Sequence, residues 1–179
     1  MIRLPLDAYY TPDDVAQKCV AVLGSLYGLD CLEPSAGGGA FCRAIAKAGG
    51  MIHAVDVNPD APAFVHLTDR CTVMDYKQFN PTWRPDWVIG NPPFSEAEEH
   101  VRHTFGMVRP AIGTAFLLRL AMLESAKREA FWRLFPPAEV HVLTRRPSFT
   151  GGGTDSAAYG FFVWRAGFNG TTALRWISA

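Results

Sequence analysis

The stretch that decides the fold is EPSAGGGAF, residues 33–41. A short apolar segment at 31–33, typical of a strand, leads into it, and a helical pattern follows from Phe41 to Ala48. A glycine loop between a strand and a helix is typical of α/β sheets, which bind ligands beyond the carboxyl ends of their strands. Since glycine has no side chain, the loop lets the backbone approach a ligand closely. The same glycines are also compatible with a simple turn that binds nothing.

The chemistry of this loop disfavours a dinucleotide. The fingerprint G-x-G-x-x-G would need a third glycine at the position where this chain has Cys42. Glu33 would also place a negative charge beside a pyrophosphate. A cationic or zwitterionic ligand fits better, because the Glu33 carboxylate can accept hydrogen bonds from an ammonium group.

Outward from the loop, strand and helix patterns alternate along the chain. Thr11 and Pro12 are typical of a helix cap and a first helical residue, and helical spacing continues to Leu23. Further helices are expected at about 59–67, 95–108 (capped by Ser95) and 123–135. Strands are expected at 31–33, 51–56, 71–74, 86–90, 113–120, 140–144 and 159–165, with 172–177 as a candidate for one more.

This alternation predicts an α/β fold. Strands that are separated by helices form a mostly parallel sheet covered on both faces. The last two of the seven strands are joined by a long loop without a helix, so they can pair as an antiparallel hairpin at one edge. We therefore expect a seven-stranded sheet of this kind, in a single domain over residues 1–179.

Two aspartates follow expected strands. Asp56 ends the second strand, 23 residues after Glu33, where a carboxylate can hold two ribose hydroxyls. Its alternative role is to cap the turn at Asn58-Pro59. Asp75 follows the third strand and can accept from an adenine amino group, or it can cap a helix instead.

The most specific motif is Asn91-Pro92-Pro93-Phe94, at the end of the fourth strand. Two prolines fix the backbone, so the Asn91 amide oxygen and the Pro92 carbonyl point in set directions as acceptors. An aryl amine is a poor nucleophile because its lone pair is delocalised into the ring. Two acceptors that hold its hydrogens favour a pyramidal nitrogen with a freer lone pair, and Phe94 can stack on the ring. A proline-stiffened turn is the alternative.

The order Tyr10-Thr11-Pro12, EPSAGGGAF, Asp56, Asp75, NPPF resembles the class I S-adenosylmethionine-dependent amino-methyltransferases, whose fold is Rossmann-like. It is most similar to the DNA adenine-N6 methyltransferases, especially small phage-type ones. The resemblance implies methyl transfer to N6 of adenine in DNA, with S-adenosylmethionine as cofactor, no metal, and Asn91, Pro92, Pro93 and Phe94 at the target base. It also implies a cofactor site made of Tyr10, Thr11, Pro12, Glu33, Ser35, Gly37, Gly39, Phe41, Asp56, Val57, Asp75, Tyr76 and Asn91.

The loop after the sixth strand is a candidate for substrate binding. Arg145 and Arg146 can meet phosphates, and Ser148 and Phe149 follow them, with Phe149 able to stack on a base. A paired target base has to be flipped out of the duplex before its amine can react. An ordinary hairpin loop with solvated arginines is the alternative.

Composition and charge limit the classes of protein to which this chain can belong. The chain is 49% hydrophobic and 19% charged, which excludes disorder. Net charge is zero, but residues 1–100 hold 7 Lys/Arg against 13 Asp/Glu, and residues 101–179 hold 10 against 4. The basic second half favours a polyanionic partner. Four cysteines without CxxC spacing and five ungrouped histidines predict no metal site.

We expect a protein without a membrane span or signal peptide, in the cytoplasm of a bacterial or phage-infected cell. No separate target-recognition domain fits, so we expect only a few bases to be read, by the loops at 79–85, 107–113 and 145–158. A homodimer or an accessory protein could extend that footprint. Three alternatives stay open: the same chemistry on RNA, methylation of glutamine in a protein, and a non-catalytic nucleic-acid-binding subunit.

Overall fold

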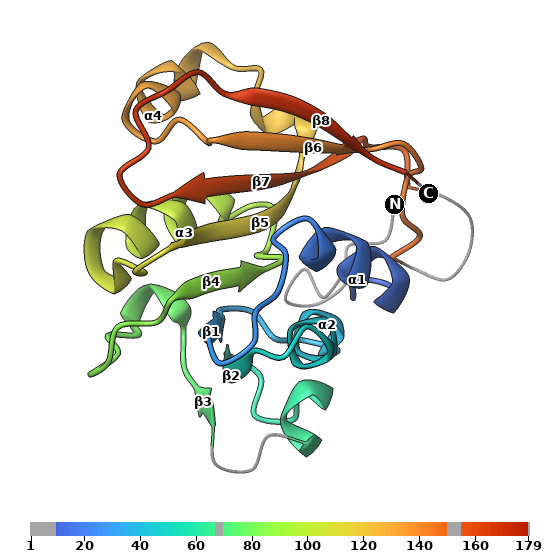
Figure 1. Cartoon of the computed structure of the whole chain (residues 1–179), viewed down its shortest axis with the longest axis vertical. Helices are drawn as coiled ribbons and strands as arrows, with labels where there is room; N and C mark the ends of the chain where they lie inside the picture. The colour runs from blue at the N-terminus through green and yellow to red at the C-terminus, as the bar shows by residue number, and fades with distance from the viewer. Residues whose placement is uncertain (1–9, 67–69, 150–154, 179) are drawn as a thin grey trace.

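An eight-stranded sheet forms the centre of the computed structural model, which describes residues 10–66, 70–149 and 155–178 (Figure 1). Its strands are β1 (Asp30–Glu33), β2 (Met51–Asp56), β3 (Cys71–Val73), β4 (Trp87–Gly90), β5 (Gly113–Arg119), β6 (Glu139–Leu143), β7 (Tyr159–Arg165) and β8 (Ala173–Ile177). They lie in the order β3-β2-β1-β4-β5-β7-β6-β8. Only β7 runs against its neighbours, so the sheet is mostly parallel, as predicted.

The predicted count of seven strands is wrong. The candidate strand at 172–177 is confirmed: residues 173–177 form an eighth strand, parallel to β6, at the edge of the sheet. β6 and β7 do pair antiparallel, but β7 lies between β5 and β6, so their hairpin is not at the edge. The burial pattern of β8 explains why its sequence signal is weak: only Ile177 is buried, and Leu174 and Trp176 are exposed.

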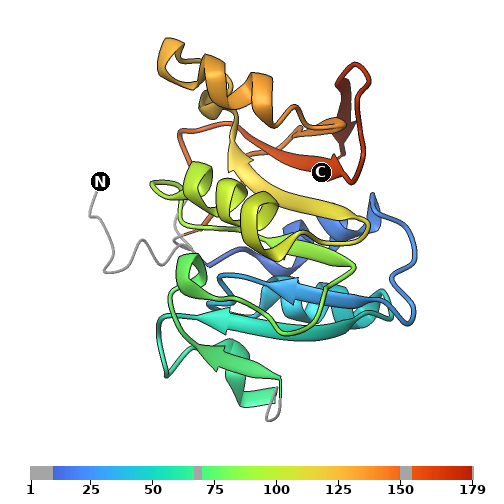
Figure 2. The same ribbon diagram turned by 90° about the vertical axis from the view of Figure 1, so that its left-hand side faces the viewer.

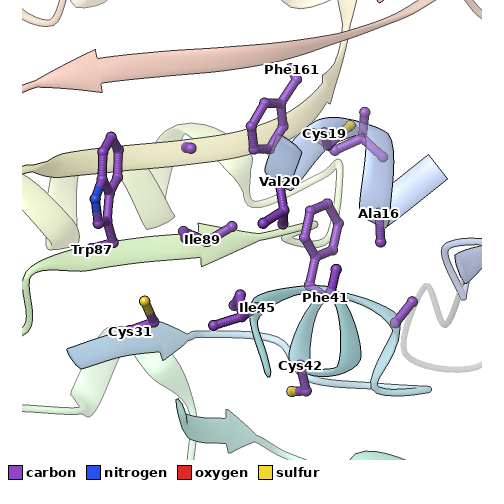
Figure 3. Close-up of a cluster of buried hydrophobic side chains, with 14 of the residues drawn as sticks. Ala16, Cys19, Val20, Cys31, Phe41, Cys42, Ile45, Trp87, Ile89 and Phe161 are labelled. Atoms are coloured by element: carbon purple, nitrogen blue, oxygen red, sulfur yellow. The ribbon is translucent and has the colours of Figure 1, made fainter. Parts of the chain in front are cut away.

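Helices cover both faces of the sheet. α1 (Asp13–Ala21) and α2 (Ala40–Lys47) lie on one face, and α3 (Ala97–His103) and α4 (Glu129–Leu134) lie on the other (Figure 2). In the central strands β1, β4, β5 and β7, alternate residues supply the two cores. On the α1 and α2 face, Phe41 stacks on Phe161 with ring centroids 6.1 Å apart, in the same cluster as Ile45 and Ile89 (Figure 3).

Several predicted helices differ at their ends. Pro12, not Thr11, is the N-cap of α1, which leaves the Thr11 hydroxyl available for another contact. Glu96, not Ser95, precedes α3. The helix predicted at 59–67 is a 3₁₀ turn at Pro62–His66, and Leu67 lies outside the described residues.

The two helices predicted beyond residue 95 are shorter than expected. The helix predicted at 95–108 changes after α3 into a π-helical turn, Thr104–Val108. Thr104 Oγ1 donates to the carbonyl of His100 at 2.7 Å, and this contact competes with the regular backbone hydrogen bonds of the α-helix. The helix predicted at 123–135 is interrupted, because Ser125 is extended and caps a new 3₁₀ turn before α4.

Candidate active site

A shallow, open cleft lies at the carboxyl ends of β1 and β4. Strand order reverses beside β1, which pairs with β2 on one side and β4 on the other, and α/β sheets bind their ligands at such a point. Its lining is Tyr10, Thr11, Glu33, Ser35, Ala36, Gly37, Gly38, Gly39, Ala40, Phe41 and Asn91. Residues that are up to 81 positions apart in the sequence therefore meet in one cleft.

Backbone geometry and close packing explain why positions 37–39 of the loop are glycines. Gly37 and Gly39 have φ of 45° and 79°, a region that side chains strain. A Cβ on Gly39 would lie 3.1 Å from the Cα of Ala63, and one on Gly38 would lie 3.1 Å from Cγ of Tyr10. The loop is therefore tightly fitted, with the Tyr10 ring lying over it.

Glu33 is a buried carboxyl group in the wall of this cleft. Its side chain is 1% exposed, and its Oε1 accepts from the backbone N–H of Ser35 at 3.0 Å. Burial raises its pKa to about 8, since Ser35 only partly offsets the loss of water and the nearby Asp56 adds negative charge. Gly90 makes room for it, because a Cβ at that position would overlap the Glu33 carboxyl group. A cation in the cleft would favour the ionised form of Glu33.

Asp56 holds the glycine loop in place. Its Oδ2 accepts from the N–H of Gly37 at 2.7 Å, and its Oδ1 accepts from the N–H of Asn58 at 2.9 Å. The turn-capping role considered from the sequence is therefore real. A carboxylate has about four lone-pair sites, so two remain for other donors. Val57, which follows it, is half-exposed.

Asn91 presents an acceptor without a partner. Its Nδ2 donates to Thr11 Oγ1 at 3.0 Å, which fixes the orientation of the amide. Its Oδ1 is buried and has no hydrogen-bond partner among the described residues. A buried acceptor left unpaired costs about 1–3 kcal/mol, so a further donor at this oxygen would be stabilising. Pro93, by contrast, already accepts from the N–H of Glu96.

Phe94 lies in a cluster of rings with a cation on its face. Its ring centroid is 6.0 Å from that of Phe149 and 5.4 Å from that of Tyr159. The Arg119 guanidinium lies 4.6 Å from the centroid of the Phe94 ring. Asp155 accepts from the Tyr159 hydroxyl, and that hydroxyl accepts from Arg119 Nε at 3.3 Å. Phe149, predicted to stack on a base, is thus mostly buried against Phe94 and Tyr159.

Five predicted cofactor residues lie outside the cleft lining: Pro12, Asp56, Val57, Asp75 and Tyr76. Asp75 caps a 3₁₀ turn by accepting from the N–H of Lys77 at 2.9 Å, which is the alternative role considered from the sequence. Tyr76 is 2% exposed, and its hydroxyl pairs with Thr104 Oγ1 at 2.8 Å. The contact of Asp75 and Tyr76 with an adenine stays a prediction.

The arginine loop lies partly within the described residues. Arg145 and Arg146 are exposed and form no ion pair there, so both are available to phosphate. Ser148 Oγ is buried without a hydrogen-bond partner among those residues. The glycine run at 151–153, which belongs to the same predicted loop, lies outside the described residues.

Sequence reasoning missed three side chains near the site: His100, Arg119 and Tyr159. Arg119 carries a weak signal, because it is the charged residue that ends the apolar strand β5. Across the described part of the chain, no three His, Cys, Asp or Glu side chains group as metal ligands. In the same residues no helix is both long and apolar enough to cross a membrane.

Comparison with solved structures defines the class of fold. A proposed class I S-adenosylmethionine-dependent methyltransferase from Listeria monocytogenes superposes with a TM-score of 0.74 at 15% identity, over 98% of this chain and 68% of its own. The chain therefore has the fold of class I methyltransferases.

Two further neighbours have more particular descriptions. One is the methyltransferase subunit of a type I restriction-modification system from Streptococcus thermophilus, with a TM-score of 0.71 at 15% identity over 90% of this chain. The other is the 23S rRNA methyltransferase ErmE. It superposes with a TM-score of 0.67 at 14% identity, over 90% of this chain and 72% of its own. The chain spans only 46% of the Streptococcus subunit, and 45% of a modification subunit of a proposed type I restriction enzyme from Vibrio vulnificus. No family model and no curated protein matches the sequence.

Proposed function

We propose that the chain is an S-adenosylmethionine-dependent methyltransferase that acts on the N6 amino group of adenine in DNA. The observation that carries this proposal is the buried Oδ1 of Asn91, which has no hydrogen-bond partner among the described residues and lies beside a glycine-lined cleft. Asn91 lies at the carboxyl end of β4, the strand next to β1, so the acceptor and the glycine loop face one space. An aromatic amine is the kind of donor that such an acceptor lacks.

The residues around the cleft fit the proposed cofactor. Glu33 offers a carboxylate to an ammonium group, and the glycine loop brings backbone within reach without side chains. Asp56, which already holds Gly37, has acceptor sites left for ribose hydroxyls. Tyr10 and Thr11 complete the wall on the side of Asn91. When bound, S-adenosylmethionine supplies an electrophilic methyl group on a sulfonium.

The protein's part in the reaction is to position the amine and accept from it. Asn91 Oδ1 and the Pro92 carbonyl would accept from the two amine hydrogens and favour a pyramidal nitrogen. The amine nitrogen would use its lone pair to accept the methyl group, which the bound cofactor would supply while its sulfur keeps the electron pair of the broken bond. The nitrogen then loses one proton to water. Orientation and preorganised acceptors supply the rate enhancement.

A nucleic-acid substrate is supported by the surroundings of Phe94. Its partner Phe149 follows Arg145 and Arg146 in one loop, so exposed cations and an aromatic cluster adjoin the proposed amine site. A DNA substrate would place the chain in the cytoplasm of a bacterial or phage-infected cell. Recognition of longer sites would fall to a second copy or an accessory protein.

Labelled methyl transfer to duplex DNA, single-stranded DNA, RNA and protein in parallel tests the substrate class. We expect incorporation into DNA. Preferential labelling of RNA or of glutamine side chains would replace the DNA assignment while keeping the chemistry. Cofactor binding without transfer to any of the four would identify a non-catalytic subunit and overturn the proposal.

Asp56→Ala is expected to weaken S-adenosylmethionine binding by roughly 10- to 100-fold, because charge-assisted hydrogen bonds contribute about 1.5–3 kcal/mol each. The Gly37 N–H also loses its acceptor. Titration calorimetry measures the affinity, and Asp60→Ala, an exposed aspartate of the same segment, is the matched control. Equal affinities of the Asp56 variant and the wild type would limit Asp56 to holding the turn.

The double substitution Arg145→Ala/Arg146→Ala is expected to weaken DNA binding on every sequence. It should also flatten the slope of log K against log salt by about 0.9 for each phosphate that an arginine no longer neutralises. Lys127→Ala/Arg133→Ala removes the same charge from the segment around α4 and serves as control. A salt slope that both double variants change equally would show that only net charge matters.

A further inference from the structure

His100 connects the helix after NPPF to the glycine loop. It lies in α3, is 3% exposed, and stacks on Tyr76 with centroids 5.1 Å apart. Its Nε2 lies 3.2 Å from Ser35 Oγ, and its Nδ1 lies 3.1 Å from the carbonyl oxygen of Glu96. Ser35 lines the cleft, so His100 stands directly behind a residue of the proposed cofactor site.

These partners determine where the proton of the imidazole lies. A carbonyl oxygen can only accept, so Nδ1 must carry the hydrogen that it donates to Glu96. Burial lowers the pKa of His100, and Lys77 lowers it further, against the carboxylates of Glu96 and Asp75 that raise it. The ring is therefore neutral near pH 7, and its Nε2 is an acceptor.

The direction of the Ser35 hydroxyl follows from this tautomer. Because Nε2 accepts, the hydroxyl hydrogen of Ser35 points to His100, away from the cleft. The backbone N–H of Ser35 donates to Glu33 Oε1, so both donors of Ser35 are used within the protein. What Ser35 Oγ presents to the cleft is lone pairs alone, beside the Glu33 carboxyl group, which a bound cation would ionise.

We propose that His100 is a positioning residue that holds the Ser35 hydroxyl as an acceptor for the ammonium group of the cofactor. This inference rests on the proposed function, since it needs a ligand with N–H donors at Glu33. Ser35 and Glu33 then both accept hydrogen bonds from the ligand. The His100 imidazole fixes the direction of the Ser35 hydroxyl and does not contact the ligand itself.

The test compares two probes by titration calorimetry: S-adenosylmethionine and 5′-methylthioadenosine, which lacks the ammonium group. His100→Ala and Ser35→Ala should each weaken S-adenosylmethionine binding about 3- to 10-fold, the value of one hydrogen bond, and leave 5′-methylthioadenosine nearly unchanged. The double variant should be no weaker than either single variant, because both remove the same interaction. His100→Gln, whose amide oxygen can accept from Ser35, should restore most of the affinity.

His103→Ala is the matched control, because His103 lies in the same helix and also contacts Tyr76, yet bonds to the Phe79 carbonyl and not to Ser35. It should leave the ratio of the two affinities unchanged. Additive losses in the double variant, or an equal loss for both probes, would overturn the positioning role. If the wild type binds neither probe, the proposed function itself fails. If His100→Ala does not fold, Ser35→Ala and His100→Gln still decide the matter.

Discussion

Asn91→Ala is expected to lower the rate of methyl transfer by about 10²–10³-fold, the usual effect of removing one preorganised polar partner of the reacting group. The affinity for S-adenosylmethionine should stay nearly unchanged, since the orphan Oδ1 is proposed to meet the target amine. Single-turnover kinetics on DNA give the rate, and calorimetry gives the affinity.

Two variants separate chemistry from structure at this position. Asn91→Asp keeps an oxygen at Oδ1 but loses the N–H that donates to Thr11, so it tests whether the fixed orientation matters. Asn80→Ala, at an exposed asparagine, is the control for an amide removed elsewhere. Near-normal transfer by Asn91→Ala would remove Asn91 from the mechanism.

Glu33→Gln is expected to stabilise the free protein near neutral pH and to weaken cofactor binding. The folded protein keeps the Glu33 proton up to about pH 8, whereas the unfolded chain loses it near 4.5. Stability that this group contributes is therefore fully present below pH 4.5 and is lost as pH rises to about 8. At about 1.36 kcal/mol per pKa unit, the loss is on the order of a few kcal/mol.

Glutamine carries no charge, so the variant should not show this loss between pH 4.5 and 8. Chemical unfolding at several pH values measures it, with Glu124→Gln, an exposed glutamate, as control. The same variant should bind S-adenosylmethionine roughly 10- to 100-fold more weakly, since it lacks a charge-assisted bond. Parallel stability curves for wild type and Glu33→Gln would show that Glu33 is ionised in the folded protein.

The local parts of the site were predictable because short-range chemistry decides them. Positive φ at Gly37 and Gly39 demands glycine, and the strand before the loop places Glu33 at its carboxyl end. The acceptors of Asp56 act on neighbours within the same edge of the sheet. The sequence around Glu33, the glycine loop and Asp56 therefore predicts both the α/β fold and the position of the cleft.

The long-range parts were not predictable, because they depend on strand register. Arg119 meets Tyr159 only because β7 enters the sheet beside β5, which sets the two residues opposite each other. His100 reaches Ser35 across 65 positions, through the packing of α3 on the sheet. For β8 the sequence indicated a candidate strand at 172–177 but not its place in the sheet, which backbone pairing with β6 sets.

The most direct test of the central claim is to identify the methylated product. The purified chain is incubated with duplex DNA and S-adenosylmethionine that carries an isotope-labelled methyl group, and the DNA is digested and analysed by mass spectrometry. We expect labelled N6-methyl-2′-deoxyadenosine, which Asn91→Ala should produce at a rate about 10²–10³-fold lower. Label confined to another nucleoside, or unlabelled DNA under conditions where the same protein methylates RNA or protein, would contradict the central claim.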